Sequence, residues 1–143
     1  MTSIANLIDE LKFDVQFQST PRAITDEEYI SIVTRGIRKL YVDTGRSDEY
    51  VSIGYTTDDE YNLYFQADLT PVETEYVLII AKKLFYETVQ SSVNTMVSYS
   101  TNALTVTQGD KPYANIANTL DKLEHERIIT YYKMIPYTMS AEG

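Results

Sequence analysis

The side chain with the clearest capacity for metal chemistry is His125, the only histidine in the chain. Asp121 and Glu124 lie within one helical turn of it, so a helix would bring two or three possible ligands close together. A stable site needs a further ligand from elsewhere and partners that orient the ligands. The chain contains no cysteine, which excludes thiolate ligands. We therefore interpret Glu124–Arg127 as a solvated helix face and expect no metal ion and no cofactor.

Three consecutive acidic residues, Asp58, Asp59 and Glu60, are the second candidate for chemistry. Paired carboxylates act as general acids or bases when burial or a neighbouring charge moves a pKa toward neutrality. Threonines precede this triplet in a polar segment, which predicts a solvated turn instead. The sequence has no G-x-S-x-G, P-loop or G-x-G-x-x-G motif, and a Ser–His pair cannot be argued from one histidine. We expect no catalytic residues and no enzymatic activity.

Capping signals predict where the principal helices begin. Thr25 precedes an acidic first turn with Glu28 in the capping-box position, and Gly45 suits the left-handed residue that ends this helix. Thr70-Pro71-Val72-Glu73 is a second capping signal, and it opens a long, largely apolar helix that runs to about Val97. A short helix is predicted at residues 3–13.

The last predicted helix begins at Asp110-Lys111-Pro112 and runs to about Ile135. Its apolar positions recur at a helical spacing of three and four. This helix and the long one predict an antiparallel αα-hairpin.

Two segments alternate in the manner of β-strands. Tyr50–Tyr55 and Asn62–Gln66, with a turn at Thr56–Glu60, predict a β-hairpin in an insert at residues 47–69. Val97–Ser100 and Leu104–Thr107 predict a second hairpin. The expected fold is mainly α: a small helical bundle built on a long antiparallel αα-hairpin, with one or two short β-hairpins. We predict one domain over residues 1–143, composed of an N-terminal helix and arm (1–24), a helical core (25–135) with a polar tip (98–109), and a tail (136–143).

Charge is distributed unevenly along the chain. The net charge is −9, and residues 1–75 hold 15 acidic and 6 basic residues while residues 76–143 hold 6 of each. An acidic surface repels nucleic acid, because binding to DNA depends on neutralising phosphates. No apolar run approaches the ~18 residues of a membrane-spanning helix, and the N-terminus lacks the pattern of a signal peptide. We expect synthesis in a cytoplasm and no association with membranes.

Composition favours contacts with other proteins. The chain has 13 tyrosines, 4 phenylalanines and no tryptophan. Tyrosine suits interfaces, since its ring is apolar and its hydroxyl is polar. The segment from Thr88 to Gly109 has no charged residue. The predicted second hairpin therefore has few of the usual protections against pairing with another strand.

The order of these elements is similar to that of the small head–tail connector, or adaptor, proteins of tailed bacteriophages. The resemblance covers about residues 25–135 and rests on chain length, helix order, the long-helix start Leu69-Thr70-Pro71-Val72-Glu73, and the uncharged tip. The β-like segment Tyr50–Gln66 is longer than we expect in that family.

The resemblance implies a non-enzymatic virion protein in the neck, assembled in the host cytoplasm. Subunits would form a homo-oligomeric, dodecameric ring that docks on the portal, contacts a downstream neck or tail protein, and lets genomic DNA pass without specific binding. Asp58, Asp59 and Glu60 are candidates for the channel wall. The candidate residues for subunit, portal or neck contacts are Tyr99, Asn102, Leu104, Val106, Tyr113, Tyr132, Pro136, Tyr137 and Met139.

Two alternatives remain open from the sequence. The chain could be a small soluble protein-binding module that acts as a monomer or dimer. It could also be another neck component, a stopper or a tail terminator. The predicted helical content favours an adaptor over a stopper.

Overall fold

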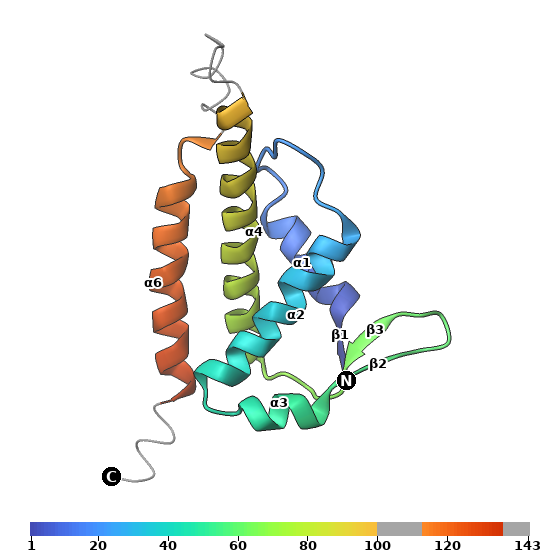
Figure 1. Ribbon diagram of the computed structural model, residues 1–143. Helices are drawn as coiled ribbons and strands as arrows, with labels where there is room; N and C mark the ends of the chain where they lie inside the picture. The colour runs from blue at the N-terminus through green and yellow to red at the C-terminus, as the bar shows by residue number, and fades with distance from the viewer. Residues whose placement is uncertain (100–112, 136–143) are drawn as a thin grey trace.

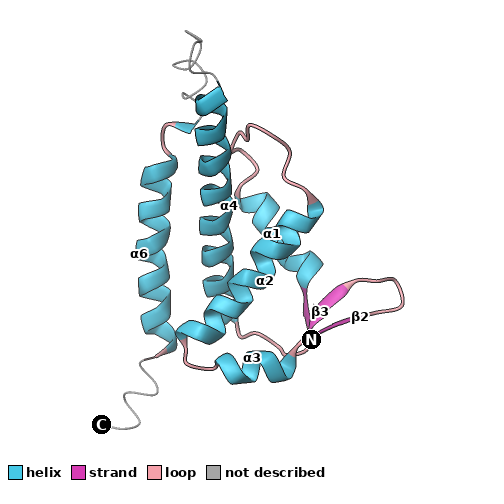
Figure 2. Cartoon of the chain, in the orientation of Figure 1, coloured by secondary structure: helices cyan, strands magenta, loops and turns pink. Residues whose placement is uncertain are grey.

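The computed structural model describes residues 1–99 and 113–135, with side chains placed in 1–95 and 113–135. Within these ranges the chain is mainly helical and carries one small antiparallel sheet (Figures 1 and 2), which confirms the predicted fold class. The helices are α1 (Ile4–Asp14), α2 (Asp26–Asp43), α3 (Ser47–Ile53), α4 (Pro71–Tyr99) and α6 (Ile116–Met134). The strands are β1 (Thr2–Ser3), β2 (Tyr55–Thr57) and β3 (Leu63–Phe65).

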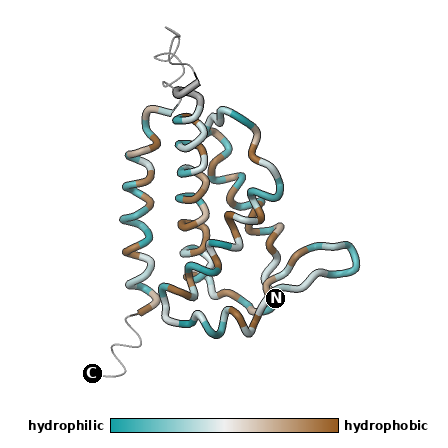
Figure 3. Tube along the Cα trace, in the orientation of Figure 1, coloured by the Kyte–Doolittle hydropathy of each residue, from teal (hydrophilic) through white to brown (hydrophobic). Residues whose placement is uncertain are grey.

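Helix α4 is the centre of the bundle, with α6 antiparallel along one side and α1 and α2 on the other (Figure 1). Its first half is apolar on several faces, and Tyr76, Val77 and Ala81 are completely buried. Figure 3 shows hydrophobic residues along much of α4 and hydrophilic ones along the loop between β2 and β3. The predicted αα-hairpin is present, and no helix in the described ranges is long and apolar enough to cross a membrane.

Both predicted capping boxes are formed. The Thr25 hydroxyl accepts a hydrogen bond from the Glu28 backbone N–H, while the Glu28 carboxylate accepts one from the Thr25 backbone N–H. Thr70 and Glu73 repeat this exchange at the start of α4. Each box satisfies backbone donors that would otherwise lack a partner at a helix start. Gly45 follows α2 with φ of 73°, the left-handed conformation that was predicted for it.

Helix α2 crosses α4 closely at Gly36. A Cβ atom added there would lie 3.0 Å from the Val77 carbonyl oxygen and 3.3 Å from a Val77 methyl group. A larger residue would therefore push the two helices apart. This contact sets the approach of α2 to α4, and Val33, Ile37 and Leu40 of α2 are completely buried.

The sheet has the strand order β1-β3-β2, and both pairings are antiparallel. Phe65 of β3 pairs with Thr2 on one side and with Tyr55 on the other. Phe65 is completely buried, and its ring contacts the rings of Tyr41 and Tyr50 as well as Tyr55. The sheet thus ties the N-terminus and the insert to α2.

The first strand of the predicted hairpin at Tyr50–Tyr55 is wrong over most of its length, because Ser47–Ile53 forms helix α3. Tyr50 and Ile53 are three residues apart, a spacing that also places two side chains on one helix face. Both pack against the core while Val51 is 79% exposed, so the helical spacing decides which side chains are buried. The second strand is correct, and the turn of the hairpin lies at Asp58–Asn62.

The second predicted hairpin is wrong where the structure tests it. Val97–Tyr99 continues α4 and does not form a strand. Its remaining residues, Ser100–Thr107, lie outside the described ranges. So does the predicted helix start at Asp110–Pro112; helix α6 itself begins at Ile116.

Candidate interaction surfaces

An ionic network joins α2, α4 and α6. The Tyr76 hydroxyl on α4 donates a hydrogen bond to the Asp43 carboxylate on α2 and accepts one, 3.1 Å long, from Arg127 Nη1 on α6. Arg127 also donates to both carboxylate oxygens of Glu124, with Nη2–Oε1 at 2.6 Å. Lys83 on α4 forms an ion pair with the same Glu124 carboxylate. The network therefore connects the three long helices through side chains that are partly buried.

The network fixes the protonation states of the Glu124 carboxylate and the Tyr76 phenol. Hydrogen bonds from Arg127 lower the pKa of Glu124 to about 2, despite the opposing effect of partial burial. Burial, together with the hydrogen bond to Asp43, raises the pKa of Tyr76 to about 12. A general acid or base that works near pH 7 needs a pKa near neutrality. Glu124 and Tyr76 move away from that range, so the arrangement suits the clamping of helices and not proton transfer.

His125 takes no part in this network. It is exposed on α6, whereas the neighbouring Glu124 carboxylate is occupied by Arg127 and Lys83. No group of three or more potential metal ligands occurs in the described part of the chain. The prediction of a solvated face is correct for His125 and Glu126 but wrong for Glu124 and Arg127. Arg127 is drawn inward because Tyr76 and Glu124 offer it hydrogen bonds beside α4.

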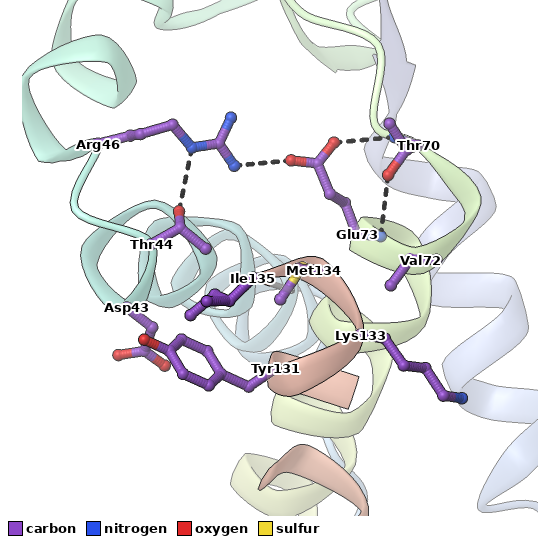
Figure 4. Close-up of a pocket in the computed structure, with 10 residues that line it drawn as sticks. All are labelled: Asp43, Thr44, Arg46, Thr70, Val72, Glu73, Tyr131, Lys133, Met134 and Ile135. Atoms are coloured by element: carbon purple, nitrogen blue, oxygen red, sulfur yellow. Dashed lines mark hydrogen bonds and ion pairs between the residues drawn. The ribbon is translucent and has the colours of Figure 1, made fainter. Parts of the chain in front are cut away.

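A cleft of about 760 Å³ lies where the C-terminal end of α6 meets the start of α4 and the end of α2 (Figure 4). Arg46 spans it, donating to the Thr44 hydroxyl at 3.0 Å and to a Glu73 carboxylate oxygen at 2.7 Å. Burial opposes ionisation of Glu73, but the Thr70 backbone N–H and Arg46 outweigh it and lower its pKa. The charged groups that cross the cleft are thus paired with each other, and they connect α2 to the capping box of α4.

The β2–β3 tip, residues 58–62, projects from the body of the molecule (Figure 1). Asp58 organises it: its carboxylate accepts hydrogen bonds from the backbone N–H groups of Glu60 and Asn62, both at 2.9 Å. These bonds and the Asn62 side chain lower the pKa of Asp58. Asp58, predicted for a channel wall, is therefore chiefly a turn-forming residue. Asp59 and Glu60 are exposed, and Tyr61 is 87% exposed with φ of 65°.

A groove of about 230 Å³ lies between α2 and α4. Ile80 and Leu84 contribute apolar side chains to it, and its charged lining consists of Arg35, Lys39, Lys83 and Glu87. Lys39 and Lys83 have internal partners, Asp43 and Glu124. Arg35 and Glu87 make no hydrogen bond or ion pair with any residue that the structure describes. The sequence alone does not mark Arg35 and Lys39 as site residues, because their neighbours on α4 are distant in the chain.

Large apolar side chains are exposed on separate elements of the bundle. Phe13, on the last turn of α1, and Phe17, just after the helix, are 70% and 93% exposed. Ile129 and Tyr132 on α6 are 60% and 59% exposed. Of the predicted contact residues, Tyr132 is thus accessible, while Tyr113 is half-buried against the core. The Tyr99 side chain and the following predicted contact residues lie outside the described side chains: Asn102, Leu104, Val106, Pro136, Tyr137 and Met139.

Comparison of the chain with protein-family models, with curated proteins and with solved structures finds no match.

Proposed function

We propose that this chain is a head–tail connector, or adaptor, of a tailed bacteriophage: a non-enzymatic subunit of a homo-oligomeric, dodecameric ring. The ring docks on the portal in the virion neck, contacts a downstream neck or tail protein, and extends the DNA channel toward the tail. The observation that carries the proposal is the exposure of large apolar side chains on separate parts of a well-packed bundle.

A ring requires two different faces on each subunit, because its interfaces join unlike surfaces head to tail. Helix α1 and helix α6 lie on different sides of α4 (Figure 1). Exposed Phe13 and Phe17 lie on the last turn of α1 and just after it, and exposed Ile129 and Tyr132 lie on α6. A single dimer interface would need only one such surface. Two separate surfaces suit a subunit that has a neighbour on each side.

The charge of the chain fits a protein that surrounds DNA without binding it. The net charge is −9, and Asp59 and Glu60 are exposed at the β2–β3 tip. A wall along which DNA slides must not hold phosphates, and acidic side chains meet that requirement. The proposal is supported by the order of the three long helices α2, α4 and α6, while helix α3 occupies part of the segment that was predicted to be a β-hairpin.

The test combines the purified full-length chain with the portal protein of the same virus. Negative-stain imaging and sedimentation should show an added ring of density on the portal particle and a larger sedimentation coefficient. Gel-shift titration with duplex DNA at physiological salt should show no binding. A chain that never joins the portal, or that binds duplex tightly, would refute the proposal and favour a separate protein-binding module.

A matched pair of variants tests the α6 surface. Ile129→Asp places a charge on the exposed apolar face and should abolish incorporation into the portal particle. Asn118→Asp adds the same charge at another exposed position of α6 and should have little effect. Both variants should retain the far-UV circular dichroism of the parent chain, because neither side chain is part of the core.

A further inference from the structure

We infer that the β2–β3 tip of one copy inserts Tyr61 into the α2–α4 groove of a second copy. This inference rests on the proposed self-assembly and names the contact that joins neighbouring subunits. The occupant is a second copy of this chain, because the tip and the groove are complementary in charge, in polarity and in size.

The tip presents one aromatic ring beside two exposed acidic side chains. Tyr61 is 87% exposed, and Asp59 and Glu60 directly precede it with side chains that make no bond to other described residues. Tyr61 also holds a positive φ of 65°, which is costly for a residue other than glycine. Asp58 maintains this conformation through its bonds to the Glu60 and Asn62 N–H groups. The ring is therefore displayed on an ordered turn, which reduces the entropy lost on binding.

The groove offers what this tip lacks. Ile80 and Leu84 supply apolar contact. Arg35, which has no partner in the described ranges, supplies a free positive charge beside Lys39 and Lys83, which are paired with Asp43 and Glu124. Cavities of about 150 Å³ admit benzene, so a groove of about 230 Å³ has room for a phenol ring. Arg35 can pair with an incoming carboxylate or lie over the ring, since arginine favours both contacts.

The unpartnered Glu87 explains why tyrosine suits this groove better than phenylalanine. Its carboxylate lies at the groove and accepts no hydrogen bond from any residue that the structure describes. A tyrosine hydroxyl is a suitable donor for such a carboxylate. The Arg35 guanidinium of the groove faces Asp59 and Glu60 of the incoming tip. In a chain with a net charge of −9, this pairing also offsets the repulsion between copies.

The tip and the groove lie on different faces of the bundle. The tip points away from α6, whereas Lys83 in the groove pairs with Glu124 on α6 (Figure 1). Each copy can therefore donate a tip on one side and receive one on the other. Such a contact is heterologous and generates a closed ring or a chain of copies.

Engineered cysteines test the contact directly, because the chain has no cysteine of its own. The double variant Glu60→Cys with Arg35→Cys is oxidised both as the free full-length chain and with the portal present. A ladder of disulfide-linked dimers, trimers and larger species on a non-reducing gel supports the contact. Absence of the ladder in both samples overturns it, as does an equal yield of dimers from either single variant.

Charge reversal provides the second arm, read by sedimentation velocity or, where the free chain is monomeric, by incorporation on the portal. Arg35→Glu should weaken assembly about 10-fold or more, and adding Glu60→Arg should restore it. Arg38→Glu is the matched control, since Arg38 is exposed on α2 but does not line the groove, and it should change assembly less than 3-fold. Failure of the second charge reversal to restore assembly would overturn the inference.

Truncation of the aromatic ring is the third arm. Tyr61→Ser should weaken assembly about 30-fold, as expected for a central aromatic contact, whereas Val51→Ser, at another exposed apolar residue, should not. A normal portal particle without the disulfide ladder would refute this contact and leave the proposed function standing. A ladder without portal binding would support this contact and refute the proposed function.

Discussion

Replacement of Glu124 by glutamine tests whether the ionic network stabilises the bundle as its geometry implies. Glutamine preserves the size of the side chain and one hydrogen-bond acceptor but removes the negative charge between Arg127 and Lys83. We expect Glu124→Gln to destabilise the fold at pH 7 and to have progressively less effect as the pH falls.

The magnitude follows from the pKa of Glu124, which falls from an ordinary value of 4.5 to about 2 in the fold. At ~1.36 kcal/mol per pKa unit this corresponds to about 3 kcal/mol. The side chain is 39% exposed, so solvent screening reduces the expected contribution to about 1–2 kcal/mol. A lowered pKa stabilises the fold above the unfolded value, so the contribution is complete above about pH 5 and is lost as the pH falls toward 2.

Urea unfolding followed by far-UV circular dichroism measures this contribution between pH 2.5 and pH 7. The free energy of unfolding of the variant should lie about 1–2 kcal/mol below that of the parent at pH 7, and the two should converge near pH 2.5. Glu126→Gln is the matched control, because Glu126 is exposed on the same helix and its carboxylate makes no ion pair in the described ranges. A destabilisation that is equal at both pH values, or that the control reproduces, would refute the reasoning.

Two further predictions concern the crossing of α2 and the β2–β3 tip. Gly36→Ala should lower the free energy of unfolding by about 1–2 kcal/mol: overpacking against the Val77 carbonyl oxygen, 3.0 Å from the new Cβ, outweighs the ~1 kcal/mol gain in helix propensity. Thermal unfolding measures this change, and an increase in melting temperature would contradict the close approach of the helices. Asp58→Ala should accelerate amide hydrogen exchange at Glu60 and Asn62 while core amides exchange as before, because the turn loses its acceptor. Unchanged exchange at those two amides would show that Asp58 does not order the tip.

Local signals predicted the helix starts correctly because both partners of each interaction are close in sequence. A capping box joins residues three positions apart, so Thr25 with Glu28 and Thr70 with Glu73 reveal their helices without knowledge of the fold. Gly45 is a similar case, since its left-handed conformation depends mainly on the chain on either side of it.

The errors fall where a local pattern fits two structures. Val51, Ile53 and Tyr55 alternate as in a strand, whereas Tyr50 and Ile53 have the spacing of one helix face. The contacts of Tyr50 with Tyr41 and Phe65 favour the helical arrangement. Nothing in the sequence indicated strand β1, because a strand of two residues is too short to show the alternation of apolar and polar side chains. It forms through pairing of Thr2 with Phe65, far along the chain.

For the candidate contact surfaces, too, some features follow from the sequence and others only from the tertiary structure. Assembly with other proteins stays a prediction, and it rests on composition alone: an acidic, tyrosine-rich chain without catalytic motifs. Only the tertiary structure brought Arg127 to Tyr76 and Asp43, and only it placed Arg35 beside Ile80, Leu84 and Glu87 in one groove. These residues lie on different helices, and their proximity depends on how closely α2 and α6 approach α4. Packing between distant segments sets that approach, and no short stretch of sequence encodes it.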